Sequence, residues 1–179
     1  MKKVLILSGS PRKGGNSDLL CDEFMRGALA SGNEVTKIRV AEKNVGYCRA
    51  CYACARNGGV CVQNDDMKEI LSAMESADVL VLATPVYFYS ASAQLKTVID
   101  RTLARWTKLK NKEFYYIMTS AEESDTVMDG TLAVLRGFAD CLEGSAEKGI
   151  LMGQGAEKRG DIREKPAFAA AFEMGRNIR

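Results

Sequence analysis

Histidine is absent from this 179-residue sequence, and its absence removes several kinds of chemistry at once. Without an imidazole, the chain has no Ser-His-Asp or Cys-His nucleophile, no histidine general base and no metal site that mixes histidine with carboxylates. Its chemistry must therefore depend on a cofactor, or on Cys, Asp, Glu, Lys, Arg or Tyr side chains.

The sequence also lacks a long hydrophobic run and an excess of charge of either sign. Its N-terminal apolar run, residues 4–7, is far shorter than the roughly 7 to 15 residues of a signal-peptide core, and no segment reaches the roughly 18 apolar residues of a membrane span. The 25 basic and 23 acidic residues leave a formal charge of +2, without the basic run typical of nucleic-acid binding. We therefore expect a soluble, cytoplasmic protein with reduced thiols and with neither a nucleic-acid nor a membrane partner.

Five short apolar segments are typical of strands. Four are nearly continuous runs, as in strands buried on both faces of a parallel sheet, and one alternates like a strand at a sheet edge. The segments are Lys3–Leu7, Val35–Val40 (the alternating one), Asp78–Ala83, Phe114–Thr119 and Gly149–Met152. Apolar residues at helical spacing between them predict one α/β domain over residues 1–179, a three-layer sandwich whose ligand site lies beyond the C-terminal ends of the strands.

Two polar segments fit this alternation poorly. Residues 44–64 form a cysteine-rich insertion, and residues 153–166 form a connection that we expect to cross the surface or to reach a partner subunit. Near the end of one predicted helix, Lys96, Asp100 and Arg101 are expected to make surface ion pairs or helix-end contacts, without a catalytic role.

A loop rich in glycine and serine, SGSPRKGGNS over residues 8–17, links the first predicted strand to a helix. It fails the nucleoside-triphosphate pattern, because Gly15 and Asn16 stand where Lys and Ser or Thr would follow Gly14. N–H groups at a helix N-terminus suit a phosphate, and hydroxyls without an essential lysine favour a monophosphate such as that of FMN. The side chains that suit this phosphate are Ser8, Ser10, Arg12, Asn16 and Ser17. The alternative is a plain strand-to-helix turn with Asn16 or Ser17 as its N-cap.

Four features of the sequence together resemble the NADPH-dependent FMN reductase and iron-sulfur flavoprotein superfamily. They are the run GSPRKGGNSDLL, the segment NDDMKEI, the segment TPVYFYSASAQLKTVIDR and the clustered cysteines. The resemblance extends over nearly the whole chain and implies a flavodoxin-like fold, with a five-stranded parallel sheet in the order 2-1-3-4-5. It also implies that the first loop holds the FMN phosphate through Ser10, Arg12, Asn16 and Ser17.

The segment TPVYF, residues 84–88, resembles the family segment that lies along the isoalloxazine ring of FMN. We expect the proline to shape a turn, exposed backbone amides to bond the polar edge of the ring, and one of the two aromatic residues to pack on it. The residues expected near the ring are Pro85, Val86, Tyr87 and Phe88, together with Ser120 in the position of the family's third flavin loop. The alternative is that Tyr87, Phe88 and Tyr89 cap the core.

Four of the six cysteines, Cys48, Cys51, Cys54 and Cys61, have the spacing C-x2-C-x2-C-x6-C. Zinc usually binds two separated C-x2-C pairs, whereas three cysteines two residues apart are typical of an iron-sulfur cube. The resemblance adds that such a compact motif binds a 4Fe-4S cluster in iron-sulfur flavoproteins. Zinc, free thiols and reversibly paired thiols remain alternatives.

These features predict an FMN-binding oxidoreductase that passes electrons from NAD(P)H to a small acceptor such as a flavin, a quinone, a nitroaromatic compound or oxygen. FMN carries the chemistry, so no catalytic side chain is expected. A first alternative is an electron carrier whose 4Fe-4S cluster is reduced by ferredoxin; a second is a non-catalytic, zinc-stabilised binding module. The resemblance further implies a homodimer or homotetramer, in which Trp106 and residues 153–166 are candidates for the interface.

Overall fold

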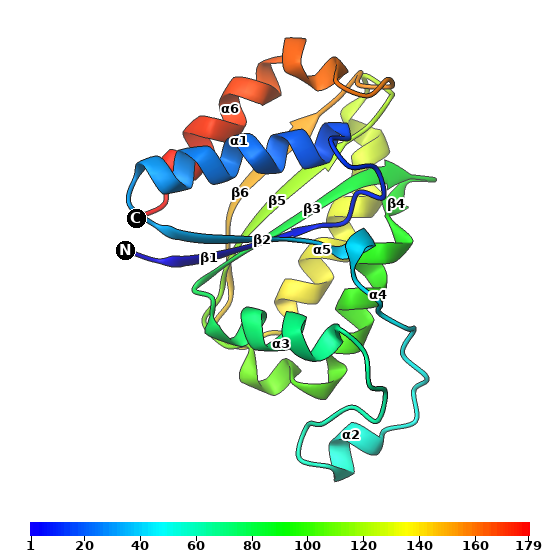
Figure 1. Ribbon diagram of the computed structural model, residues 1–179. Coiled ribbons are helices and arrows are strands. Elements are labelled where there is room, and N and C mark those ends of the chain that lie inside the picture. The colour runs from blue at the N-terminus through cyan, green and yellow to red at the C-terminus, as the bar shows by residue number, and fades with distance from the viewer.

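A five-stranded parallel sheet lies at the centre of the molecule (Figure 1). The computed structural model describes residues 1–179, except for the side chain of Asp125. The strands are β1 (Lys3–Ser8), β2 (Glu34–Arg39), β3 (Val79–Tyr87), β5 (Glu113–Thr119) and β6 (Ala146–Gly153), in the order β2-β1-β3-β5-β6. In sequence order this is 2-1-3-4-5, so the predicted flavodoxin-like sheet is confirmed.

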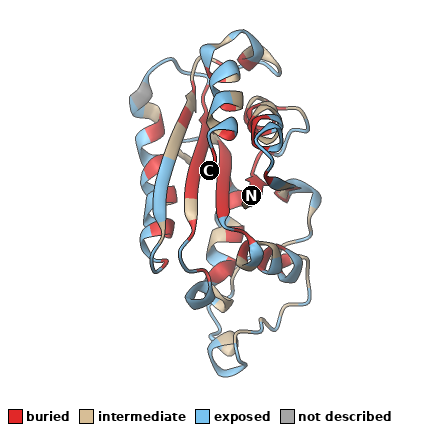
Figure 2. Cartoon of the chain, turned by 90° about the vertical axis from the view of Figure 1, so that its left-hand side faces the viewer, coloured by how far each residue is buried: buried red, intermediate tan, exposed pale blue. Residues whose placement is uncertain are grey.

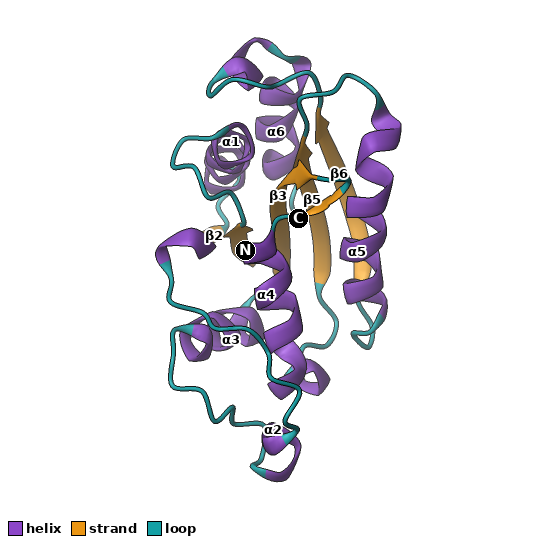
Figure 3. Ribbon diagram, turned by 90° about the vertical axis from the view of Figure 1, so that its right-hand side faces the viewer, coloured by secondary structure: helices purple, strands orange, loops and turns teal.

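Helices cover both faces of the sheet (Figures 1 and 3). On one face, α1 (Asn16–Ala30) and α6 (Pro166–Arg176) bury a core with Phe24, Ile6 and Ile117. On the other face, α3 (Met67–Ser76), α4 (Ala93–Arg101) and α5 (Asp129–Asp140) bury a second core with Leu80, Tyr116 and Phe138. Figure 2 shows the buried residues along the strands and on the inner sides of the helices, as the three-layer prediction requires.

Shorter elements complete the chain. A single turn of helix, α2 (Ala53–Arg56), lies in the cysteine-rich segment, which hangs below the body of the molecule in Figure 1. Five 3-10 turns span Val40–Glu42, Thr102–Ala104, Trp106–Lys108, Asp125–Met128 and Asp161–Glu164. Among the helices that the structure describes, none combines the length and apolar character needed to cross a membrane.

Two glycines let α1 and α6 approach very closely. A Cβ atom added to Gly27 would lie 2.0 Å from the carbonyl oxygen of Phe172, and one added to Gly175 would lie 2.0 Å from that of Phe24. Each helix therefore packs against the backbone of the other. This contact fixes α1, and with it the loop at its N-terminus, relative to the end of the chain.

The structure corrects the prediction for residues 84–89. β3 does not end at Ala83 but continues to Tyr87, so Pro85 lies in a strand and does not shape a turn. Pairing of β3 with β1 stops at Ala83, opposite Ser8. Beyond that point β3 makes no hydrogen bonds to β1, so the N–H group that Pro85 lacks is not needed on that side. The turn follows at Phe88 and Tyr89, before the sixth strand.

That sixth strand, β4 (Ser90–Ala91), was not predicted. It pairs antiparallel with Val86 and Tyr87, so β3 and β4 form a hairpin with a two-residue turn. Both turn residues, Phe88 and Tyr89, have positive φ, 49° and 62°, as a type I′ hairpin turn requires. Their side chains are exposed, that of Phe88 fully, so the alternative in which these aromatic residues cap the core is wrong for both.

Candidate functional site

The C-terminal ends of β1, β3 and β5 meet around one hollow of about 200 Å³. This is the edge of a parallel sheet at which α/β proteins bind their ligands. Loop 8–17 forms one wall, the end of β3 a second, and the residues after β5 a third. The lining residues are Ser10, Arg12, Gly15, Asn16, Ser17, Pro85, Val86, Tyr87, Thr119, Ser120, Ala121, Ala156 and Glu157.

The N-terminus of α1 gives the hollow the character of an anion site. Gly15 occupies the N-cap position and its helix end has no side-chain cap, so the N–H groups of the first turn have no partner within the helix. Ser17 is only 1% exposed, and its buried hydroxyl has no hydrogen-bond partner among the described residues. A buried unpartnered hydroxyl beside free N–H groups fits a phosphate, and Arg12 adds a positive charge at the rim.

The structure uses Asn16 differently from the prediction, although the residue does line the hollow. Its Nδ2 donates to the carbonyl oxygens of Ala156 (2.8 Å) and Lys158 (2.9 Å), and its Oδ1 accepts from the N–H of Gly160 (3.0 Å). The side-chain amide is therefore engaged with residues 153–166. Phosphate contact by Asn16 stays a prediction. The group of Asn16 that remains free to make this contact is its backbone N–H.

Ser8 lies outside the hollow. Its buried hydroxyl donates to Asp18 Oδ1 at 2.9 Å, so it supports the loop through this carboxylate. Asp18 also accepts the N–H of Gly14 at 2.8 Å, and Gly14 has a φ of 65°, which glycine adopts without strain. The Asp18 carboxylate thereby holds the glycine turn of the loop in shape.

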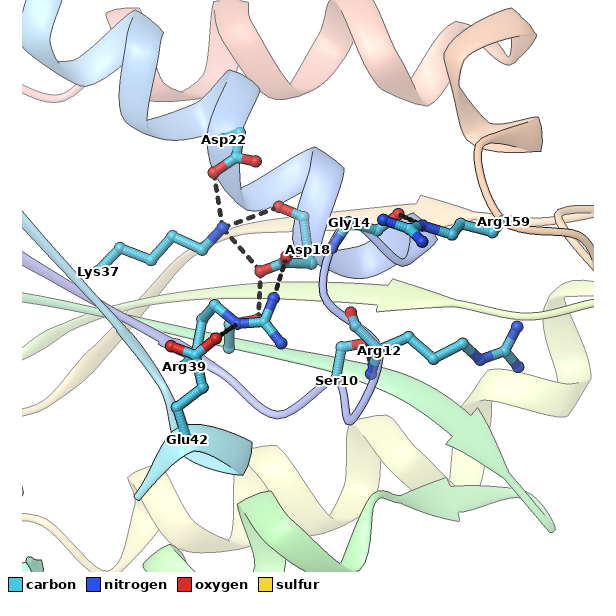
Figure 4. Close-up of polar contacts among 10 residues, drawn as sticks. Ser10, Arg12, Gly14, Asp18, Asp22, Lys37, Arg39, Glu42 and Arg159 are labelled. Carbon is cyan, nitrogen blue, oxygen red and sulfur yellow. Dashed lines mark hydrogen bonds and ion pairs between the residues drawn. The ribbon is translucent and has the colours of Figure 1, made fainter.

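Two cations from β2 neutralise this carboxylate (Figure 4). Lys37 Nζ lies 2.7 Å from Asp18 Oδ1, and Arg39 Nη1 lies 2.6 Å from Oδ2. Burial alone would raise the pKa of Asp18, but the bonds from Lys37, Gly14 and Ser8 together hold it below the ordinary value. Likewise burial would lower the pKa of Lys37, whereas Asp18 and Asp22 raise it. The loop therefore rests on a charged network without presenting a free negative charge to an anion.

The connection 153–166 folds back over this loop, which places Ala156 and Glu157 in the wall of the hollow. Arg159 Nε donates to the carbonyl oxygen of Gly14 at 3.2 Å (Figure 4). The first of the two expectations for this segment, that it crosses the surface, is confirmed. Its contribution to the wall of the hollow was not predicted, because nothing in its sequence indicates contact with loop 8–17.

The second wall is tied to the first by a buried serine. Ser92 Oγ donates to the carbonyl oxygen of Gly9 at 2.7 Å, and its own N–H donates to Thr84 Oγ1 at 2.9 Å. Ser92 is also the N-cap of α4, accepting the N–H of Leu95. These bonds keep the end of β3, with Pro85, Val86 and Tyr87, in register with loop 8–17.

The remaining predicted residues divide between the wall and the surface. Ser120 lines the hollow, and its hydroxyl donates to the carbonyl oxygen of Glu122 at 2.8 Å. Tyr87 lines it and is 38% exposed. Phe88 lies outside the hollow at the hairpin tip, and contact between Phe88 and a ligand in the same chain stays a prediction.

A second, smaller hollow lies in the cysteine-rich segment. Cys48, Cys51, Cys54 and Cys61 all line it, although the described residues hold no group of three or more His, Cys, Asp or Glu side chains gathered closely enough for a single metal ion. A single zinc needs its sulfur ligands within about 2.3 Å of one point, whereas the irons of a cube lie at separate corners. Four thiols around one hollow fit a cluster by donor type and number.

The backbone around these cysteines is strained in a way that suits an anion. Ala50 and Tyr52 have positive φ, 48° and 54°, and Tyr52 directly precedes the first helical residue of α2. A left-handed residue followed by a helical one turns successive N–H groups toward one point, an arrangement found at phosphate and iron-sulfur sites. Such strain at non-glycine residues persists where the surroundings or a ligand maintain it.

Arg101 departs from the surface role expected from the sequence. It is 2% exposed and makes two bonds to the Asp65 carboxylate, from Nη1 at 2.7 Å and from Nη2 at 2.9 Å. Burial would raise the pKa of Asp65, but Arg101 and two backbone N–H groups lower it. By contrast, Lys96 and Asp100 form the expected exposed pair at 2.7 Å.

The sequence is similar to iron-sulfur flavoproteins and to an FMN-containing oxidoreductase. An iron-sulfur flavoprotein of Archaeoglobus fulgidus is 45% identical over 103 residues, which is 58% of this chain and 46% of that protein. A putative NAD(P)H-dependent FMN-containing oxidoreductase of Bacillus subtilis is 22% identical over 181 residues, with 96% of each chain covered. The chain thus spans about half the length of the iron-sulfur flavoproteins that it matches.

Solved structures share the fold, and a family model matches the sequence. An NAD(P)H:quinone oxidoreductase from Methanothermobacter marburgensis superposes with a TM-score of 0.79 at 16% identity, over 98% of this chain and 95% of that one. An FMN-dependent NADH-azoreductase from Bacillus anthracis, solved with FMN, gives 0.74 at 19% identity, over 98% of each. The model for NADPH-dependent FMN reductases matches residues 2–140, well over half of the chain. The chain therefore belongs to the NADPH-dependent FMN reductase family.

Proposed function

We propose that the chain binds FMN in the hollow at the N-terminus of α1 and passes electrons from NAD(P)H to a small acceptor. The observation that carries this proposal is the buried, unpartnered hydroxyl of Ser17 beside the free N–H groups of the first turn of α1. An oxygen-rich anion at that point would satisfy the hydroxyl and the N–H groups together. Family membership supports FMN as the molecule that carries the anion.

Each wall of the hollow has a part in this proposal. Loop 8–17 would hold the phosphate through Ser17 and the backbone N–H groups, and Arg12 would add positive charge. Ser10 lines the same wall, where its hydroxyl donates to the carbonyl oxygen of Arg12 at 3.2 Å. Val86 and Tyr87 flank the ring, and Ser120 lies at the opposite wall. Bound FMN supplies the two-electron chemistry, so the absence of histidine costs the reaction nothing. The chain's own contribution is to hold the phosphate and to orient the ring.

We further propose that a second copy of the chain completes the site. The hollow encloses about 200 Å³, less than the roughly 300–1,000 Å³ of a typical small-molecule pocket. Beside it, Phe88 and Tyr89 present unburied aromatic surface on the β3-β4 hairpin. Aromatic side chains on a rigid turn are typical of protein interfaces. A homodimer or homotetramer would cover the ring and the hairpin together.

An electron-carrying cluster is the second candidate function. It is favoured by the four thiols around one hollow and by the relatives named iron-sulfur flavoproteins. A 4Fe-4S cluster held by Cys48, Cys51, Cys54 and Cys61 would admit electrons singly, from a ferredoxin-type donor. NAD(P)H would then be a poor donor.

Protein purified without oxygen is used to test these proposals. Acid precipitation should release FMN, and NADH or NADPH should be oxidised in the presence of a quinone or an azo or nitroaromatic acceptor. A chain that neither carries nor takes up FMN would refute the first proposal.

After reconstitution with iron and sulfide, about four irons per chain would support the cluster. We expect Cys51→Ser to lose that iron and to keep FMN; full iron retention would contradict the ligand role.

A further inference from the structure

One buried side chain, Arg101, contacts the cysteine-rich segment at both of its ends. Nη1 donates to the carbonyl oxygen of Gly46 at 2.6 Å, where the segment leaves the body of the molecule. The two bonds to Asp65 lie where the segment returns to α3. The N–H of Gly46 also donates to Asp65 Oδ2 at 3.0 Å, so the two ends are joined directly as well as through Arg101.

The same guanidinium reaches one of the cysteines. Nη2 lies 3.5 Å from Cys61 Sγ, within hydrogen-bond range for sulfur. Arg101 Nε is buried, and no partner for it exists in the part of the chain that the structure describes. Arg101 therefore has donor capacity beyond what Asp65 and Gly46 use, and Nη2 directs part of it to Cys61.

Two basic side chains line the hollow of the four cysteines, and one of them, Arg101, is paired with Asp65 behind it. Arg101 and Arg49 line it, and the described lining residues include no aspartate or glutamate. Thiolate-ligated clusters are anionic, and hydrogen bonds to their sulfurs and the charge around them set their reduction potentials. A planar guanidinium suits this place because one nitrogen can hold a carboxylate while another faces a sulfur.

We infer that Arg101 is the positioning residue of the cysteine-rich segment. Its bonds to Gly46 and Asp65 hold the two ends of the segment together, which we call the closed base. Its bond to the Cys61 sulfur would stabilise the added electron of a bound cluster. The second half of this inference rests on the proposed cluster. The first half, the closed base, holds for the metal-free chain as well.

Arg105 supplies a matched control. It lies one turn beyond Arg101, and its Nε donates to the carbonyl oxygen of Gly59 in the same segment at 2.8 Å. It also pairs with Glu75 at 3.1 Å. Arg105 thus anchors the segment to the body without a hydrogen bond to a cysteine among the described residues. Its replacement separates anchoring from contact with sulfur.

The closed base is tested first on metal-free protein. Trypsin sites at Arg49 and Arg56 are exposed within the segment. We expect Arg101→Gln to speed cleavage there at least tenfold, because the segment loses its link to both ends. The double variant Arg101→Gln/Asp65→Asn, which leaves no unpaired carboxylate, should show the same increase while still binding FMN. Cleavage at the wild-type rate in both variants would overturn the closed base.

The contact with sulfur is tested on protein reconstituted with iron and sulfide. We expect Arg101→Lys to keep most of its iron and to shift the cluster's reduction potential to a more negative value, because it loses the bond to Cys61. Arg105→Gln should leave the potential at the wild-type value. An unchanged potential in Arg101→Lys, or an equal shift in Arg105→Gln, would overturn the sulfur contact while the cluster itself stands. If the wild type takes up no iron, the proposed cluster and the bond to its sulfur are both refuted. The trypsin assay alone then decides the closed base.

Discussion

Replacing Asp18 with asparagine removes the charge on which loop 8–17 rests. Asp18 is 3% exposed and accepts bonds from Gly14, Ser8 and two cations. Breaking a buried ion pair costs about 3–5 kcal/mol. Here Lys37 keeps Asp22 at 2.6 Å and Arg39 keeps Glu42 at 3.0 Å, so part of the pairing survives. We expect Asp18→Asn to lower the free energy of unfolding by about 2–3 kcal/mol.

Urea unfolding of the flavin-free protein at pH 7 measures this loss, and Asp22→Asn is the matched control. Asp22 pairs with the same lysine, but its side chain is 55% exposed, so its loss should cost no more than about 1 kcal/mol. Because the pKa of Asp18 is lowered in the fold, its stabilising effect is present above the unfolded pKa, roughly 3.9, and is lost as pH falls through the folded value. The difference between wild type and Asp18→Asn should therefore be constant at neutral pH and shrink below about pH 4. Equal losses for Asp18→Asn and Asp22→Asn at pH 7 would refute the reasoning.

Three further predictions concern the helix crossing, the hairpin and the phosphate. Gly27→Ala should lower the free energy of unfolding by about 1–3 kcal/mol, because its Cβ would meet the Phe172 carbonyl oxygen. Gly137→Ala in α5, where a Cβ meets nothing within 4 Å, should raise it by up to about 1 kcal/mol, and equal shifts of the two variants in thermal melts would contradict this prediction. Phe88→Asn should leave the stability of the monomer unchanged or raise it by about 1 kcal/mol, since the ring is fully exposed and asparagine tolerates positive φ; a clear loss in urea unfolding of dilute protein would show that the ring packs within its own chain. Ser17→Ala should weaken FMN binding about tenfold or more, as expected for a lost bond to a charged group, without loss of stability; unchanged FMN affinity in a fluorescence titration would remove Ser17 from the phosphate site.

The sequence predicted the sheet well because its central strands are simple. Lys3–Leu7 and Asp78–Ala83 are apolar on both faces, and in a parallel sheet only buried strands show that pattern. The position of the hollow could also be predicted, because a serine- and glycine-rich turn between a buried strand and a helix lies at the ligand-binding edge of a parallel sheet. Phosphate binding there stays a prediction. Both inferences depend on residues that are neighbours in the sequence.

Contacts between distant residues were beyond the sequence. Lys37 and Arg39 alternate with apolar residues and so indicated a solvent-facing strand surface, but they meet Asp18 on α1, about twenty residues away. Arg101 ends a helix, where a basic side chain usually meets solvent, and only the return of the cysteine-rich segment buries it against Asp65. The prediction of a turn at Pro85 was wrong for the same reason, since it took no account of where β1 stops pairing with β3.

Comparative binding of FMN and riboflavin tests the central claim most directly, because the two ligands differ only in the phosphate. Flavin-free protein would be titrated with each ligand while flavin fluorescence is followed. If loop 8–17 and the N-terminus of α1 hold the phosphate, FMN should bind at least about a hundredfold more tightly than riboflavin, as two or more charge-assisted bonds imply. Equal affinities would contradict the account, because the site would then recognise the ring alone.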